Sequence, residues 1–221
     1  MKNRNLSILL IVLLSASFIT AQEKISFAIL GGANFQNLNG TDYSDNELDN
    51  NMMIGYHAGV NIAIQIAPEF YFQPGLMYAV KGAKNEVGAI NSTTTLNYIE
   101  MPLNMVYKAM LGNGSIMLGF GPYLAYGISG KRKTEGGPIT LTQDVKFHSS
   151  VDSSDPLLAP YYKPLDVGAN ILFGYEMVSG IFLQLDAQYG MYNINPEYKG
   201  LSTDKSKTNN TGFGLSLGYR F

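Results

Sequence analysis

Hydrophobic and polar residues alternate with a period of two along most of the chain. Over residues 53–66, isoleucine, tyrosine, alanine and valine on one face alternate with glycine, histidine and asparagine on the other. Such alternation predicts β-strands whose two faces meet different environments. Segments of at least 11 residues follow this pattern at Ile25–Gln36, Met53–Ile66, Phe70–Gly82, Leu96–Lys108, Ile116–Ser129, Leu165–Glu176, Ile181–Tyr192 and Thr211–Phe221. Each is long enough to cross a bilayer as a strand, which takes about 9–11 residues.

The connections between these segments alternate between long and short. They contain 16, 3, 13, 7, 35, 4 and 18 residues in chain order. Barrels of the outer membrane have short periplasmic turns and longer external loops. The order therefore predicts an all-β fold, an eight-stranded antiparallel up-and-down transmembrane β-barrel. Its first strand runs outward, and Phe221 ends at the periplasmic rim.

The composition of the two faces decides which one points inward. The apolar face of the eight segments carries no Asp, Glu, Lys or Arg, whereas the other face carries seven charged residues and 13 glycines. A soluble lipocalin-like barrel is the alternative, but its water-facing side would carry about 25–35% charge. A glycine-rich face suits a narrow interior. An uncharged face suits lipid, where Lys or Arg at midplane costs about 2–4 kcal/mol.

The N-terminal 21 residues have the pattern of a secretory signal peptide. Lys2 and Arg4 precede an apolar run over residues 6–19, and small residues follow as far as Ala21. This order predicts cleavage after Ala21. The run is shorter than the roughly 20 residues of a membrane helix, which disfavours a retained anchor helix. We therefore expect a signal peptide at 1–21 and one barrel domain at 22–221.

Composition excludes several other classes of protein. The chain has no cysteine, so it has no disulfide, no thiolate metal site and no lipidated N-terminal cysteine. Charged residues make up 14% of the chain and the formal net charge is -2. That balance gives no basic surface for nucleic acid, and we expect no nucleic-acid partner.

Four segments resemble the PorT-type outer-membrane β-barrel family of Gram-negative bacteria. They are FYFQPGLMYAVKGAK (70–84), NYIEMPLNMVYK (97–108), GFGPYLAYGISGK (119–131) and LDVGANILFGYE (165–176). The resemblance implies an eight-stranded barrel in the outer membrane with no general catalytic signature, and some family members assist protein secretion. Tyr219 and Phe221 resemble the C-terminal signal that the barrel-assembly machinery reads during biogenesis. That machinery and outer-membrane lipid are the expected partners.

Three prolines fall inside predicted strands, at Pro74, Pro102 and Pro122. Each removes one donor from a β-ladder. We expect them to mark bulges or points where a strand leaves the hydrogen-bonded wall. The family resemblance places Pro74 and Pro102 inside the usual strand motifs.

Charged residues on the inward face predict a polar network inside the barrel, because buried charges need partners. The predicted network contains these charged residues and one histidine: His57, Lys81, Glu100, Lys108, Asp166, Glu176, Asp186 and Arg220. Strand direction places Lys108, Glu176 and Arg220 near the periplasmic end. We expect this network to close the interior, with a narrow ion or solute path as the alternative.

No catalytic, cofactor-binding or metal-binding residues are expected. His57 is the only histidine in a predicted strand, and spacing assembles no Ser, His and Asp group around it.

The acidic loop Thr41–Asn51 lacks the spacing of a calcium loop, so we expect a solvated loop, with weak cation or lipopolysaccharide contacts as the alternative. In the longest loop, ITLTQDVKF alternates as if to extend the sheet, and Tyr161 and Tyr162 suit an interfacial aromatic girdle.

The sequence thus predicts a non-enzymatic integral outer-membrane barrel with a plugged polar interior, whose external loops form a contact surface. One alternative is an accessory component of protein secretion or envelope assembly. A second alternative is a barrel-embedded enzyme that modifies lipid or peptide.

Overall fold

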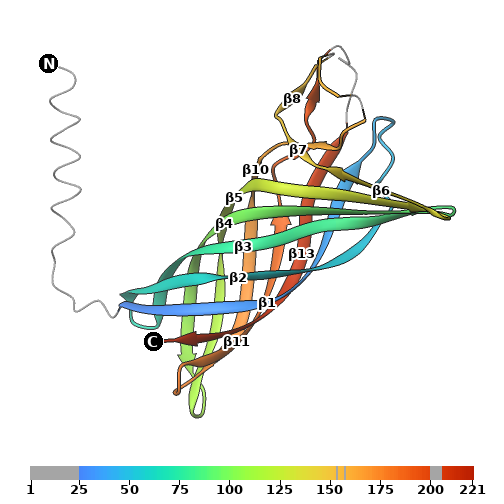
Figure 1. Ribbon diagram of the computed structural model, residues 1–221. Coiled ribbons are helices and arrows are strands. Elements are labelled where there is room, and N and C mark those ends of the chain that lie inside the picture. Colours follow the sequence, from blue (N-terminus) through green and yellow to red (C-terminus); the bar gives the residue numbers. More distant parts are fainter. Residues whose placement is uncertain (1–24, 153, 157, 200–205) are drawn as a thin grey trace, which may run out of the picture.

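The computed structural model describes residues 25–152, 154–156, 158–199 and 206–221 (Figure 1). The predicted signal peptide at 1–21 lies outside these described residues. Within them, no helix has the length and apolar character needed to cross a membrane. The strands are β1 Ile25–Thr41, β2 Asn50–Ala67, β3 Phe70–Val87, β4 Ile90–Met110, β5 Gly114–Gly136, β6 Ile139–Asp144, β7 Lys146–Phe147, β8 Ser150–Val151, β9 Tyr161–Tyr162, β10 Leu165–Met177, β11 Ile181–Gly190, β12 Glu197–Tyr198 and β13 Lys207–Arg220.

Eight long strands pair in a closed cycle. Strands β1 to β5 pair in chain order, β5 pairs with β10, β10 with β11, and β11 with β13. The cycle closes where β13 pairs with β1, with Ala28 opposite Arg220. Every one of these pairings is antiparallel, so the prediction of an eight-stranded antiparallel up-and-down barrel is confirmed. A closed cycle leaves no wall strand with an unpaired edge.

The two faces of the wall separate as the sequence predicts. His57 on β2 is 5% exposed and points inward, whereas Ile54, three residues earlier on the same strand, is 69% exposed on the outer face. On β4, buried Tyr98 and Glu100 alternate with exposed Ile99 and Met101. The large apolar side chains therefore cover the outside of the barrel.

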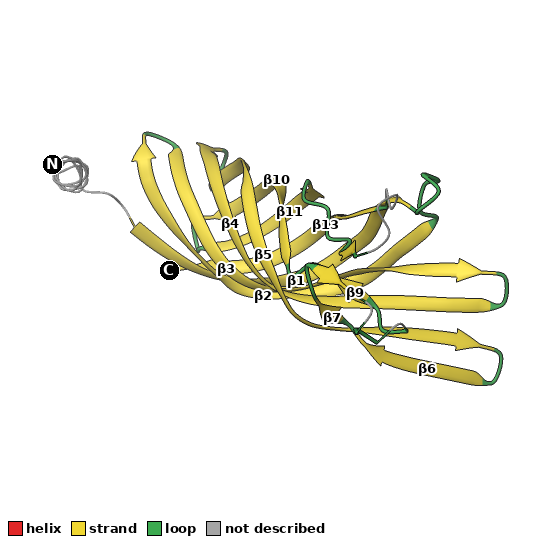
Figure 2. Cartoon of the chain, turned by 90° about the horizontal axis from the view of Figure 1, so that it is seen from above, coloured by secondary structure: helices red, strands yellow, loops and turns green. Residues whose placement is uncertain are grey.

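Strands β3, β4 and β5 run beyond the predicted segments on the side of the long loops, and β6 adds a further strand there. The structure replaces the 13-residue loop predicted after Gly82 with a hairpin that turns at Gly88, where φ is +62°. The prediction failed there because residues 83–95 are mostly polar and form no regular apolar face, so cross-strand pairing holds them without a clear hydrophobic contrast. Strand β6 pairs with β5 and confirms the expected extension of the sheet. Figure 2 shows the β5–β6 hairpin projecting away from the wall.

The described residues of 145–164, which exclude 153 and 157 and are called segment 145–164 below, fold back over the mouth of the barrel. The Val145 amide donates to the Gly130 carbonyl, and the Gly127 amide donates to the Pro164 carbonyl. The Phe147 ring meets the Tyr98 ring edge-on, with 6.1 Å between centroids. Tyr161 and Tyr162 are each 6% exposed, so their prediction as girdle residues was wrong. The fold of this segment, rather than distance along the chain, decides their environment.

The three strand prolines produce no bulge. Pairing between β3 and β4 stops after Pro74–Leu103 and resumes at Met77–Glu100 in the same register. Between β4 and β5 it stops after Pro102–Tyr123 and resumes at Met105–Phe120, again without a shift, while Pro122 pairs continuously with Ala169 of β10. Of the two expected alternatives, the bulge is therefore wrong, and a point where the strand leaves the hydrogen-bonded wall is confirmed. The prolines accompany short interruptions of the ladder, as expected for residues without a backbone donor.

The interior is layered. Along β4, inward Leu96 and Tyr98 belong to one apolar cluster, Glu100 lies in a polar layer, and Val106 belongs to a second apolar cluster. Lys108 follows at the end with the short turns. Polar groups in the middle of the barrel are thus enclosed by apolar side chains above and below.

Candidate functional site

Three of the predicted interior charges form one ion-paired group, which we call the central cluster: Lys81 of β3, Glu100 of β4 and Asp166 of β10. The Lys81 Nζ atom lies 2.7 Å from Glu100 Oε2 and 3.3 Å from Asp166 Oδ2. All three side chains are at most 3% exposed. Because a buried charge without a partner is costly, each carboxylate depends on the single ammonium between them.

Neutral groups complete the central cluster. The Tyr123 hydroxyl donates to Asp166, and the Asn210 amide donates to Asp166 Oδ2 at 2.9 Å. The Gln188 amide donates to Glu100 Oε1 at 2.6 Å. Lys81 Nζ lies 4.2 Å from the centre of the Tyr123 ring, a cation–π distance. These partners come from β5, β11 and β13, so the cluster ties together opposite parts of the wall.

A second group, the rim cluster, lies at the end with the short turns and comprises Lys108, Glu176 and Arg220. Glu176 Oε2 lies 2.8 Å from both Lys108 Nζ and Arg220 Nε. Arg220 Nη1 also donates to Asn61 Oδ1 at 3.2 Å. The three residues that strand direction places at the periplasmic end are thus brought together as one carboxylate between two cations.

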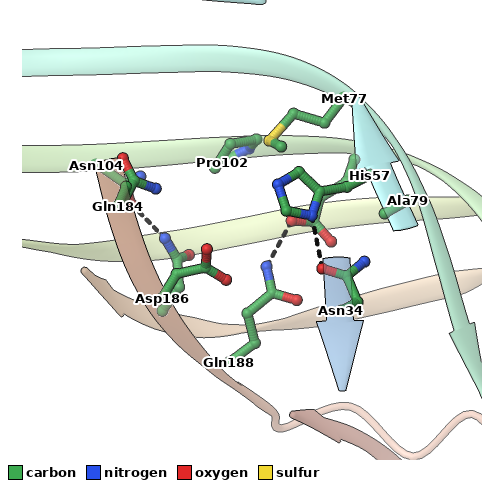
Figure 3. A pocket seen from close by; sticks show the side chains of 11 residues that line it. Asn34, His57, Met77, Ala79, Pro102, Asn104, Gln184, Asp186 and Gln188 are labelled. Atoms are coloured by element: carbon green, nitrogen blue, oxygen red, sulfur yellow. Dashed lines mark hydrogen bonds between the residues drawn. The ribbon is translucent and has the colours of Figure 1, made fainter. Parts of the chain in front are cut away.

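His57 and Asp186, the remaining members of the predicted set, line a small polar cavity of about 40 Å³ (Figure 3). His57 Nδ1 lies 2.7 Å from Asn34 Oδ1, and His57 Nε2 lies 2.7 Å from Ser216 Oγ. Glu100 and Gln188 line the same cavity. Its volume suits ordered water rather than an organic substrate.

Sequence reasoning missed Asn34 and Ser216. With His57 they place a hydroxyl, an imidazole and an orienting amide in hydrogen-bonded order, the arrangement that activates a serine nucleophile. Ser216 and His57 lie 159 residues apart, and only closure of the barrel brings them together. The sequence does place Asn34 and Ser216 on the inward face, but an inward position does not predict which side chain each residue contacts. In this structure both side chains are at most 5% exposed.

Other predicted features lie apart from these groups. Tyr219 and Phe221 stack edge-on with centroids 4.9 Å apart, on the outer face at the end of β13, and their role in assembly stays a prediction. In the acidic loop, Asp42 Oδ1 accepts hydrogen bonds from the Ser44 and Asn46 amides. In the described part of the chain, no three His, Cys, Asp or Glu side chains are grouped so as to hold a metal ion.

A comparison with family models identifies the class of this chain. A family model described as outer membrane protein beta-barrel domain matches residues 20–196. No curated protein matches the chain. Among solved structures, the attachment invasion locus protein Ail of Yersinia pestis is 11% identical with a TM-score of 0.41, over 90% of this chain and 99% of that one. Neisserial surface protein A is 12% identical with a TM-score of 0.44, over 90% of this chain and 98% of that one.

Proposed function

This chain belongs to the family of outer-membrane β-barrel domains and lies in the outer membrane, and from that premise we propose that it is a non-enzymatic barrel with a plugged interior and an external contact surface. The observation that carries the proposal is the enclosed central cluster. Its two carboxylates lie on either side of one ammonium, and the interior side chains around the cluster leave about 40 Å³ beside Glu100. Eight strands enclose an interior that side chains can fill.

The side of the barrel with the long connections supports the second half of the proposal. In outer-membrane barrels this side faces the exterior. Here it carries the β3–β6 extension, in which Ile139 is 70% exposed and Leu141 is 53% exposed. The folded segment 145–164 adds a further surface over the mouth. Anchoring in the membrane requires only the barrel wall, so the extension and the segment over the mouth provide additional external surface for contact with a partner.

Conductance in planar bilayers tests the plug. We expect the purified, folded mature protein to show no large, stable openings. A variant with Tyr98→Ala and Tyr123→Ala, which removes two rings that are 0% exposed, serves as the positive control and should open. Large stable openings in the unaltered protein would contradict a plugged interior.

The resemblance to the PorT-type family favours a second function, an accessory role in protein secretion or envelope assembly. Four sequence segments carry it, from Phe70 to Glu176. A strain that lacks the protein should then lose secreted proteins from the medium. Normal secretion in that strain would set this alternative aside and leave the contact-surface proposal standing.

The Ser216, His57 and Asn34 arrangement favours the remaining alternative, an enzyme. Our proposal instead treats the three residues as a buried hydrogen-bonded network, because the adjoining cavity of about 40 Å³ has no room for an ester or peptide. A serine-reactive fluorophosphonate distinguishes a serine enzyme from a buried hydrogen-bonded network. We expect no labelling of the folded protein. Labelling that disappears in Ser216→Ala and in His57→Ala would establish the enzyme.

A further inference from the structure

A second and larger cavity lies at the external mouth of the barrel, and we call it the mouth chamber. It has a volume of about 380 Å³, within the range of roughly 300–1,000 Å³ typical of small-molecule sites. Its walls come from strands β1 to β5, β12 and β13, from the loops at Leu48 and Asn195, and from residues 159–162 of segment 145–164. Leu38, Ala83 and Tyr162 line its base and also belong to the upper apolar cluster, so the chamber is separate from the central cluster.

Arg132 is the one charged residue in the described lining of this chamber. Its Nε donates to Thr94 Oγ1 at 3.1 Å, and its Nη2 donates to the Tyr162 hydroxyl at 2.9 Å. These two bonds hold the guanidinium in place but use only two of its five N–H groups. Arg132 is therefore oriented, with donors still available.

Arg132 also differs from the other inward cations. Lys81, Lys108 and Arg220 each have a carboxylate within 3.3 Å. Within the described part of the chain, the lining of the mouth chamber contains no carboxylate, and Arg132 takes part in no ion pair. A fixed arginine without an acidic partner is a receptor for a carboxylate or a phosphate, which its planar fork binds in bidentate fashion.

The rest of the lining indicates what carries that acidic group. Amides and hydroxyls surround the chamber, supplied by Asn50, Asn85, Ser92, Asn195 and Thr208. Tyr162 adds an aromatic ring 6.0 Å from the Arg132 guanidinium, and Tyr161 adds a second ring to the lining. Many neutral polar groups, some aromatic surface and one cation match a molecule with many hydroxyls and one negative charge.

We propose that the mouth chamber binds a small acidic saccharide, with Arg132 pairing its carboxylate or phosphate. The inference rests on the proposed external contact surface and specifies its ligand. The same chemistry occurs in the core sugars of neighbouring lipopolysaccharide and in free acidic sugars. Both sources place one anionic group among hydroxyls, and the experiment separates them.

Calorimetric titration of the folded mature protein in detergent micelles tests the site. D-galacturonic acid and D-glucose 1-phosphate are the acidic probes, and D-galactose is the neutral one. We expect the acidic probes to bind about tenfold or more tightly than D-galactose, the scale of one charge-assisted contact. A core oligosaccharide that competes with them identifies lipopolysaccharide as a source, and absence of competition assigns the site to free sugars.

Arg132→Gln should weaken the acidic probes about tenfold or more and leave D-galactose unchanged. Lys131→Gln is the matched control, because Lys131 is exposed on the same strand and carries the same charge, and it should change nothing. Arg132→Lys keeps the positive charge but removes the planar guanidinium that binds an anion in bidentate fashion, and it should give an intermediate affinity. This variant also tests the site if Arg132→Gln fails to fold.

Two results would overturn the inference: no binding of either acidic probe by protein with the heat-modifiable gel mobility of a folded barrel, or equal binding by Arg132→Gln. Conductance keeps this result distinct from the proposed function. If the barrel is closed but binds no acidic sugar, the proposed ligand is wrong and the plugged interior still stands. If the barrel conducts but binds acidic sugars through Arg132, the plugged interior is wrong and the proposed ligand still stands.

Discussion

The Lys81 ammonium lies 2.7 Å from the Glu100 carboxylate inside the barrel, and neither side chain is more than 3% exposed. The same ammonium lies 3.3 Å from Asp166. One cation therefore compensates two buried carboxylates that come from β4 and β10. This relationship makes Lys81 the residue on which the charge balance of the central cluster depends.

Replacing Lys81 with methionine should destabilise the barrel by about 3–5 kcal/mol, because Glu100 and Asp166 remain buried without their cation. The chain has no tryptophan, so the measurement is urea unfolding in detergent followed by circular dichroism. A variant that combines Lys81→Met with Glu100→Gln and Asp166→Asn should recover most of that loss, since the two carboxylates that Lys81 compensates are removed together with it. An unchanged midpoint for Lys81→Met would refute this account of the cluster.

Glu176→Gln should lower stability by about 2–3 kcal/mol, because Lys108 and Arg220 would face each other without a carboxylate. The effect is smaller than at Lys81, since Glu176 is 16% exposed and water screens it. The temperature at which the folded form shifts on a gel reports the change. Glu135→Gln is the control: its pair with Lys133 is about half exposed, and the loss should stay below about 1 kcal/mol.

Gly127→Val should release the segment 145–164 from the mouth. A β-carbon at Gly127 would collide with the Phe147 ring, so the ring would have to leave its place beside Tyr98. We expect faster tryptic cleavage after Lys146 in intact cells or proteoliposomes. Gly136→Ala tests specificity, because a β-carbon there meets only Ile90 at 3.7 Å. Equal cleavage of the two variants would mean that the Phe147 contact does not hold the segment.

The first external loop should loosen in acid. The backbone amide of Asn46, then its side chain and the Ser44 amide, donate to the Asp42 carboxylate and hold its pKa below the ordinary 3.8. A lowered pKa in the folded state means that the stabilisation is complete above 3.8 and disappears as the pH falls through the folded-state value. NMR of the Ser44 and Asn46 amides should therefore show no transition between pH 7 and 5 and a change below 3.8. Asp42→Ala should abolish that change.

Period-two alternation was enough to predict every wall strand and the direction of its faces. Whether Ile54 points outward and His57 inward depends only on neighbouring residues, because successive side chains of a strand alternate by geometry. The same rule selected the inward charges, although it could not pair them. Residues 83–95 are mostly polar and have no regular apolar face, so the pattern gave no contrast and a hairpin was mistaken for a loop.

Tertiary structure alone decided which inward residues meet. Lys81 contacts Glu100 and Asp166, while Ser216 contacts His57 across 159 residues, and no local pattern encodes either choice. The position of Arg132 beside Tyr162 likewise depends on how segment 145–164 folds over the mouth. The physical reason is that alternation is a property of one strand, whereas a contact inside a barrel depends on register, closure and loop packing, which involve the whole chain at once.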